Sequence, residues 1–177
     1  MKKIAICLWL VTCVLCVCAQ TSVPNFLKMN TPDPLPVGKV APKLEFKDMS
    51  GELVSLEHLK GNVLVLNFWN IGCKGCEQER ETLNWLSDSL KNQSVKFISI
   101  TLNHPIKQRE WFDKHPISYQ IVGNVDFMGI QGPSFFNYRC MPTTVVIGKD
   151  GVVKYNQCGP IIGKEAALAF TKHMIFK

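Results

Sequence analysis

The sequence predicts one α/β domain in which helices flank a central mixed β-sheet. The chain has 177 residues, 46% hydrophobic and 19% charged, which is typical of a globular protein and excludes a disordered tail, a collagen-like repeat and a coiled coil. Two continuous apolar runs, residues 63–68 and 95–101, have the β-rich character of buried central strands. The expected element order β, α, β, α, β, β, α implies a mixed sheet covered by helices on both faces.

The first half of the domain supplies a hairpin, two strands and two helices. Short apolar stretches at 44–46 and 53–56 flank a turn and predict a small N-terminal β-hairpin. After each of the two central strands we expect a helix, over 75–91 and 106–114, respectively.

The second half begins with a short edge strand expected at 119–122. Residues 127–138 are ambiguous because glycines and a proline interrupt them, and only their second half is expected to be helical. The run Gly148-Lys149-Asp150-Gly151 is a strong hairpin signal between strands at 143–147 and 152–155. A helix over 164–175 should close the domain.

Residues 1–19 are typical of a signal peptide. Lys2 and Lys3 precede an apolar run, and small residues end at Ala19, which predicts cleavage before Gln20. The run is too short for a membrane span. Lipoprotein anchoring is disfavoured because neither Cys16 nor Cys18 follows a small residue. Residues 20–36 are polar and proline-marked and read as a linker, so the domain occupies 37–177.

Export has consequences for charge and for cysteine chemistry. Cleavage leaves 158 residues and, with Lys2 and Lys3 removed, lowers the net charge from +6 to +4. The remaining charge is dispersed and lacks the basic stripe of a nucleic-acid surface, so no nucleic-acid partner is expected. Four cysteines remain, and an oxidising compartment allows them to form disulfides: Cys73, Cys76, Cys140 and Cys158.

The chemistry of the chain is concentrated in Cys73-Lys74-Gly75-Cys76, where a buried strand gives way to a helix. The unpaired amides at the helix start and the helix dipole favour a thiolate at Cys73. Such a thiolate can attack a partner disulfide, and the more enclosed Cys76 can then resolve the mixed disulfide. The alternative is a soft-ligand site that carries Cu(I) or zinc. A structural zinc site is disfavoured because there is no second Cys-x-x-Cys motif.

Five further sequence motifs lie before and after this pair along the chain. They are Gly38-Lys39-Val40-Ala41-Pro42, Val54-Ser55-Leu56, Asn67-Phe68-Trp69, Met141-Pro142-Thr143-Thr144 and Gly148-Lys149-Asp150-Gly151. With them the chain resembles the thioredoxin-fold thiol:disulfide oxidoreductases of the bacterial envelope, the TlpA/ResA/CcmG-like proteins related to the AhpC/TSA redoxins. The likeness covers roughly residues 37–176.

The resemblance implies a thioredoxin fold and exchange of the Cys73/Cys76 dithiol and disulfide with protein substrates, as a reductase or less often as an isomerase or oxidase. We expect a reductant of envelope proteins, located in the periplasm or cell envelope, with a membrane electron donor, a monomeric state, no metal and no bound cofactor. The family commonly has an aromatic residue before the first Cys and Pro before the second, where this chain has Gly72 and Gly75. A thiol peroxidase is a weaker alternative, because Asn70 stands where that chemistry uses Thr.

Glu79 can be placed without the family. Cys76, Glu79, Leu83, Leu86 and Leu90 recur at helical spacing, so this carboxylate lies on the apolar stripe of the helix. Its pKa should be raised, and it could exchange a proton with Cys76 during resolution. The other interpretation is an acid in the first turns of the helix, favoured by the helix dipole.

Pro142 directly precedes a β-branched strand, where a trans proline is the default. The resemblance implies instead a cis Met141-Pro142 bond, with Met141 and Pro142 binding an extended substrate segment. Trp69 is the third candidate for substrate binding. It could shield the dithiol or belong to the core, and both can hold.

Cys140 and Cys158 are not explained by the family pattern. If Lys149 and Asp150 form the hairpin tip, the register places Cys140 opposite Gly159 and Cys158 opposite Met141. A three-residue tip would shift this pairing by one position. We hypothesise a second disulfide, worth roughly 3 kcal/mol in the chain-entropy model. The rival hypothesis makes Cys140 a third redox thiol close to Cys73.

Overall fold

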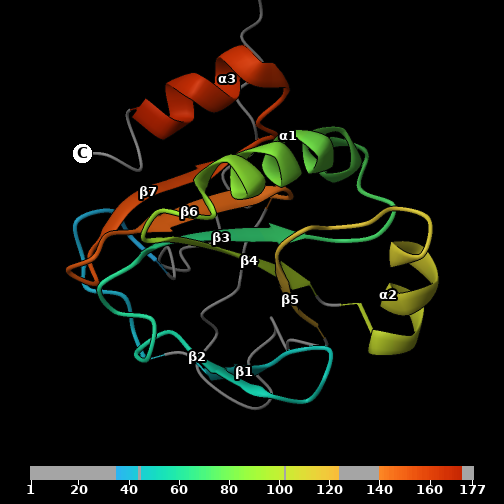
Figure 1. The fold of residues 1–177 in the computed structure, drawn as a ribbon, viewed down its shortest axis with the longest axis horizontal. Helices are drawn as coiled ribbons and strands as arrows, with labels where there is room; N and C mark the ends of the chain where they lie inside the picture. The colour runs from blue at the N-terminus through green and yellow to red at the C-terminus, as the bar shows by residue number, and fades with distance from the viewer. Residues whose placement is uncertain (1–34, 44, 102, 124–139, 173–177) are drawn as a thin grey trace, which may run out of the picture. The chain divides into compact units, whose positions relative to one another are not determined.

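The computed structural model describes residues 35–43, 45–101, 103–123 and 140–172. Within them a five-stranded sheet has the order β5-β4-β3-β6-β7 (Figure 1). Its strands are β3 (Val63–Trp69), β4 (Val95–Thr101), β5 (Gln120–Val122), β6 (Thr143–Ile147) and β7 (Val153–Cys158). β3, β4 and β5 are parallel, whereas β6 and β7 are antiparallel to their neighbours. The mixed sheet predicted from the sequence is therefore confirmed.

One face of the sheet is covered by α1 (Lys74–Leu90) and α3 (Gly163–Phe170) (Figure 1). α1 places its apolar stripe on this face because its buried residues recur every three or four positions. Leu83, Leu86 and Leu90 pack there with Val65 and Phe97. The third helix, α2 (Pro105–Phe112), lies beside the β5 edge (Figure 1). The sequence-based expectation of helices on both faces therefore differs from the structure, because the N-terminal hairpin covers the second face among the described residues.

The opposite face is covered by the hairpin of β1 (Glu45–Lys47) and β2 (Leu53–Ser55). Phe46 and Val54 of this hairpin are buried against the second apolar core, which includes Leu66 and Phe68 of β3. The predicted N-terminal hairpin is thus present. Its first strand was expected at 44–46, and residue 44 lies outside the described residues.

Other boundaries differ by a few residues from the sequence-based expectations. α1 begins at Lys74 because Cys73 caps it, and α2 spans Pro105–Phe112, where 106–114 was expected. β7 extends to Cys158, beyond the expected end at 155. The predicted signal peptide, most of the linker and the ambiguous stretch at 127–138 lie outside the described residues, as do the last residues of the expected closing helix.

Antiparallel pairing brings distant segments to one end of the sheet. Phe68, near the end of β3, lies opposite Thr143, the first residue of β6. Thr143 also lies opposite Cys158, the last residue of β7. The chain leaving β3 for α1, the chain entering β6 and the chain leaving β7 consequently converge there. No helix in the described part of the chain is both long enough and apolar enough to span a membrane.

Candidate active site at the end of strand β3

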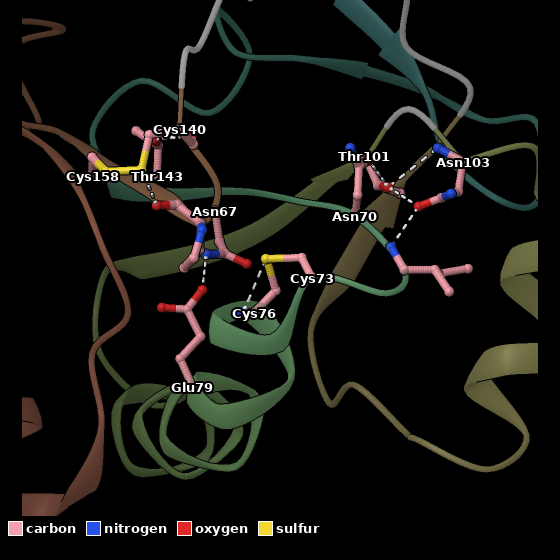
Figure 2. Close-up of a disulfide and its surroundings, with 12 residues drawn as sticks. Asn67, Asn70, Cys73, Cys76, Glu79, Thr101, Asn103, Cys140, Thr143 and Cys158 are labelled. Atoms are coloured by element: carbon pink, nitrogen blue, oxygen red, sulfur yellow. Dashed lines mark hydrogen bonds between the residues drawn. A yellow bond between two sulfur atoms is a disulfide. The ribbon is translucent and has the colours of Figure 1, made fainter.

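Cys73 and Cys76 form a disulfide at the start of α1, with Cα atoms 5.3 Å apart (Figure 2). Cys73 is the N-cap residue of the helix in an extended conformation, and its Sγ accepts from the Cys76 N–H at 3.3 Å. Gly72 precedes it with φ +84°, a conformation that side chains other than Gly rarely adopt. This turn therefore accounts for Gly72 where the resemblance leads one to expect an aromatic residue.

The two sulfurs of this pair have different surroundings. Cys76 is 5% exposed, whereas Cys73 is only half-buried. After reduction, the Cys76 N–H and the positive end of the helix dipole would stabilise a thiolate at Cys73. The geometry thus provides one accessible sulfur suited to attack and one enclosed sulfur suited to resolution.

The loop before Cys73 is held by residues that the sequence analysis did not single out. Asn103 Oδ1 accepts from the Ile71 N–H and from the Thr101 hydroxyl, each at 2.8 Å (Figure 2). Thr101 also donates to Asn70 Oδ1 at 3.2 Å. Thr101 and Asn103 could have been predicted as neighbours of this loop. They are polar residues at the carboxyl end of β4, which lies beside the carboxyl end of its parallel neighbour β3.

Glu79 is 1% exposed and lies one turn beyond Cys76 on α1. One carboxylate oxygen accepts from Asn67 Nδ2 at 2.7 Å (Figure 2). The other accepts from the Ile161 N–H at 3.1 Å. Burial raises the pKa of Glu79 to about 7, against the lowering effect of these two hydrogen bonds. The raised pKa expected from its position on the apolar stripe is therefore found, and Glu79 can exchange a proton near neutral pH.

Pro142 lies against the helix start, and the Met141-Pro142 bond is cis, as the resemblance implied. A Cβ placed on Gly75 would lie 3.1 Å from Pro142 Cδ and 3.6 Å from Pro160 Cγ. Gly75 therefore lets two prolines from other segments pack closely between the cysteines. The contact with Pro160 was not anticipated, since nothing local in the sequence links these residues.

Cys140 and Cys158 form a disulfide with Cα atoms 5.7 Å apart (Figure 2). The register predicted for this hairpin was wrong by two positions, since Cys158 lies opposite Thr143 and not opposite Met141. The turn accounts for one position, because Ile147 pairs with Val153, and the shift between Val146 and Ile147 adds the other. Cys140 nevertheless reaches Cys158, because the chain turns back before β6. The Thr143 hydroxyl donates to the Cys140 carbonyl at 2.7 Å and thereby fixes this turn.

Trp69 is buried at the end of β3, where its indole N–H donates to Ser99 Oγ. Its ring lies 4.9 Å from that of Trp111 and 5.8 Å from that of Phe112, both on α2. These are contacts of a core aromatic residue, and its part in substrate binding stays a prediction. Across the described ranges there is no cluster of three or more His, Cys, Asp or Glu side chains arranged to hold a metal ion.

Peptide mapping under non-reducing conditions tests both pairings. Trypsin cleaves after Lys74 and thereby separates Cys73 from Cys76. We expect two linked peptide pairs, 61–74 with 75–80 and 140–149 with 155–164, because the oxidised protein contains these disulfides. Mass spectrometry of the digest before and after reduction identifies them. A link between Cys73 and Cys140 would contradict this pairing and favour the third-thiol hypothesis.

Taken together, the parallel β3-α1-β4 unit, the cysteine pair that opens its helix and the proline facing that pair define a protein of the thioredoxin class. Solved structures agree on the fold. A putative DsbE thiol:disulfide interchange protein from Chlorobium tepidum superposes with a TM-score of 0.67 at 22% identity, over 78% of this chain and 95% of that one. A thioredoxin domain of a Bacteroides vulgatus thiol-disulfide oxidoreductase also gives 0.67, at 18% identity, over 79% and 99%.

Sequence comparisons place the chain more closely. The AhpC/TSA family model matches residues 37–156. The thiol-disulfide oxidoreductase ResA of Halalkalibacterium halodurans is 31% identical over 124 residues, which is 69% of each chain. The thioredoxin-like protein YneN of Bacillus subtilis is 31% identical over 132 residues, 72% of this chain and 75% of that one. The chain belongs to the AhpC/TSA family and, within it, to the TlpA/ResA/CcmG-like thiol:disulfide oxidoreductases.

Proposed function

We propose that the protein is exported and reduces disulfides of envelope proteins, with Cys73 as nucleophile and Cys76 as resolving cysteine. The observation that carries this proposal is the asymmetry of the pair: Cys73 is half-buried at the helix N-cap, whereas Cys76 is 5% exposed. The attacking thiol must be reachable by a protein substrate and readily ionised; of this pair, Cys73 is the more accessible, and the helix N-terminus favours its thiolate.

The reaction transfers two electrons in two exchanges. The Cys73 thiolate attacks one sulfur of a substrate disulfide, which forms a mixed disulfide and releases the other substrate sulfur as a thiolate. Cys76 then loses its proton to Glu79 and attacks Cys73 Sγ, which closes the Cys73–Cys76 disulfide and releases the second substrate thiolate. An external dithiol, which we place in the membrane, returns the pair to the reduced form.

Substrate positioning is assigned to the strand that starts beside the pair. Met141 and Pro142 lead into β6, and Pro142 packs against α1 at Gly75. We propose that the backbone of Met141 pairs with an extended substrate segment and presents its disulfide to Cys73. This mode of binding needs few specific side chains and suits several protein substrates.

Export is supported by the first 19 residues, which have the charged start, the apolar run and the small-residue end of a signal peptide. The four cysteines that follow form two disulfides, as expected of a protein in an oxidising compartment. The proposed location is therefore the periplasm or the cell envelope, without a lipid anchor.

One set of measurements on the purified protein tests this proposal. Equilibration in glutathione buffers should give a reduction potential of about −270 mV, the value of a reductant such as thioredoxin. A strong oxidant would instead have a potential of about −120 mV. The free thiols are titrated before and after reduction, and bound metal is measured by elemental analysis. Stoichiometric Cu or Zn on the pair would support a metal carrier instead, and a strongly oxidising potential would reverse the proposed direction.

A further inference from the structure

A second disulfide lies at the same end of the sheet as the Cys73–Cys76 pair (Figure 2). Cys140 and Cys158 are each followed, two residues later, by a proline. Both prolines pack at Gly75, the residue before Cys76: a Cβ there would lie 3.1 Å from Pro142 and 3.6 Å from Pro160. The second disulfide thus ties together the two segments that contact the start of α1 between the cysteines.

The segment that follows Cys158 is attached to α1 at successive points. The Gly159 N–H donates to the Pro142 carbonyl at 2.9 Å and links the two proline segments. The Ile161 N–H donates to Glu79 at 3.1 Å, and the Gly163 N–H donates to Thr82 Oγ1 at 3.0 Å. From the disulfide onward, the backbone therefore follows the buried face of α1 past Cys76 and Glu79.

We propose that the Cys140–Cys158 disulfide is a clamp that positions the active site, by holding Pro142 and Pro160 against Gly75 and the Ile161 N–H on Glu79. This inference rests on the proposed roles of Cys73, Cys76 and Glu79. Cys140 and Cys158 are positioning residues, since they act through these contacts and take no part in the exchange of electrons.

The clamp is needed because β7 is an edge strand that ends at Cys158. Without the disulfide, one backbone hydrogen bond, from Gly159 to Pro142, joins the two segments beyond the last β6–β7 pair among the interactions of the described residues. The Ile161 and Gly163 N–H groups attach the segment after Cys158 to α1 but not to the Pro142 segment, so the end of β7 can open locally away from β6. Small displacements at a reacting centre are costly, and a shift of about 1 Å can lower a rate about a hundredfold.

Loss of the clamp should also change how Glu79 titrates. The Ile161 N–H favours the carboxylate, so a weaker hydrogen bond moves the pKa of Glu79 further upward. The other groups around Glu79 are Asn67 on β3 and Cys76 on α1. Tyr119, before β5, and Tyr155, on β7, also sense its charge: burial raises the pKa of both phenols, and the charge of Glu79 adds to that rise.

The test compares a Cys140→Ser/Cys158→Ser double variant with the wild-type protein and with Gln157→Ser. Gln157 is the exposed neighbour of Cys158 on β7 and serves as the matched control. We expect the double variant to exchange a protein disulfide about tenfold more slowly, with the midpoint of its pH–rate profile shifted to higher pH. Gln157→Ser should match the wild-type protein. A rate and a midpoint equal to those of the control would overturn the proposal.

Pro160→Ala, which keeps both disulfides, decides the question if the double variant does not fold. It should lower the rate in the same direction by a smaller factor, because it removes the contact with Gly75 while the Cys140–Cys158 bond remains. A wild-type rate in Pro160→Ala would then overturn the clamp. Full exchange activity in Cys73→Ser would instead overturn the proposed function, so the two failures are distinguishable.

Discussion

Replacing Cys73 with serine should abolish exchange, whereas replacing Cys76 with serine should leave the first attack intact and trap the substrate. Cys73 is the half-buried N-cap residue, so its loss removes the attacking sulfur and should lower the rate about a thousandfold or more. Without Cys76, the described part of the chain offers no free thiol beside Cys73 to resolve the mixed disulfide, since Cys140 and Cys158 are bonded to each other. Reaction of each reduced variant with a disulfide-containing protein, followed by non-reducing electrophoresis, measures both outcomes.

The two variants control for each other, because the same substitution is made at neighbouring positions of one helix. A mixed disulfide that accumulates with Cys73→Ser and not with Cys76→Ser would reverse the assigned roles. Wild-type turnover by both variants would exclude this pair as the reactive centre.

The main strands of the fold could be predicted because buried strands are continuous apolar runs. Residues 95–101 and 143–147 were placed as observed, and β3 was placed to within one residue. The register of β6 and β7 could not be predicted. Part of the difference arises at the turn, which pairs Ile147 with Val153, and part at the irregularity between Val146 and Ile147; composition encodes neither.

Some residues of the site could also be predicted from the sequence, and others could not. Glu79 was found because helical periodicity determines which side chains face the core, and its burial followed from that position. Its partner Ile161 could not be found, since a backbone N–H has no sequence signature and lies 82 residues away. The role of Asn67 as a partner of Glu79 could have been predicted, because a polar residue in an otherwise apolar buried strand needs a hydrogen-bond partner.

Glu79 should make the stability of the oxidised protein depend on pH. Its pKa is about 7 in the folded protein and 4.5 for an unperturbed glutamate, so stability is unaffected below about pH 4.5 and falls as pH rises from 4.5 to about 7, above which the loss is complete. The full loss is about 3 kcal/mol in the free energy of unfolding. Glu79→Gln cannot ionise and should show no such loss. Urea denaturation of both oxidised proteins between pH 4 and 8 measures the difference.

The same titration should govern catalysis. In the proposed mechanism the ionised form of Glu79 accepts the Cys76 proton, so the resolving step of the wild-type protein should accelerate as pH rises through about 7. In Glu79→Gln that acceleration should be absent, and at pH 8 the step should be about a hundredfold slower. Glu77→Gln, an exposed acid in the first turn of the same helix, is the matched control and should follow the wild-type profile. Identical profiles for Glu79→Gln and the wild-type protein from pH 5 to 9 would show that Cys76 loses its proton by another route, and Glu79 would then be only a buried structural acid.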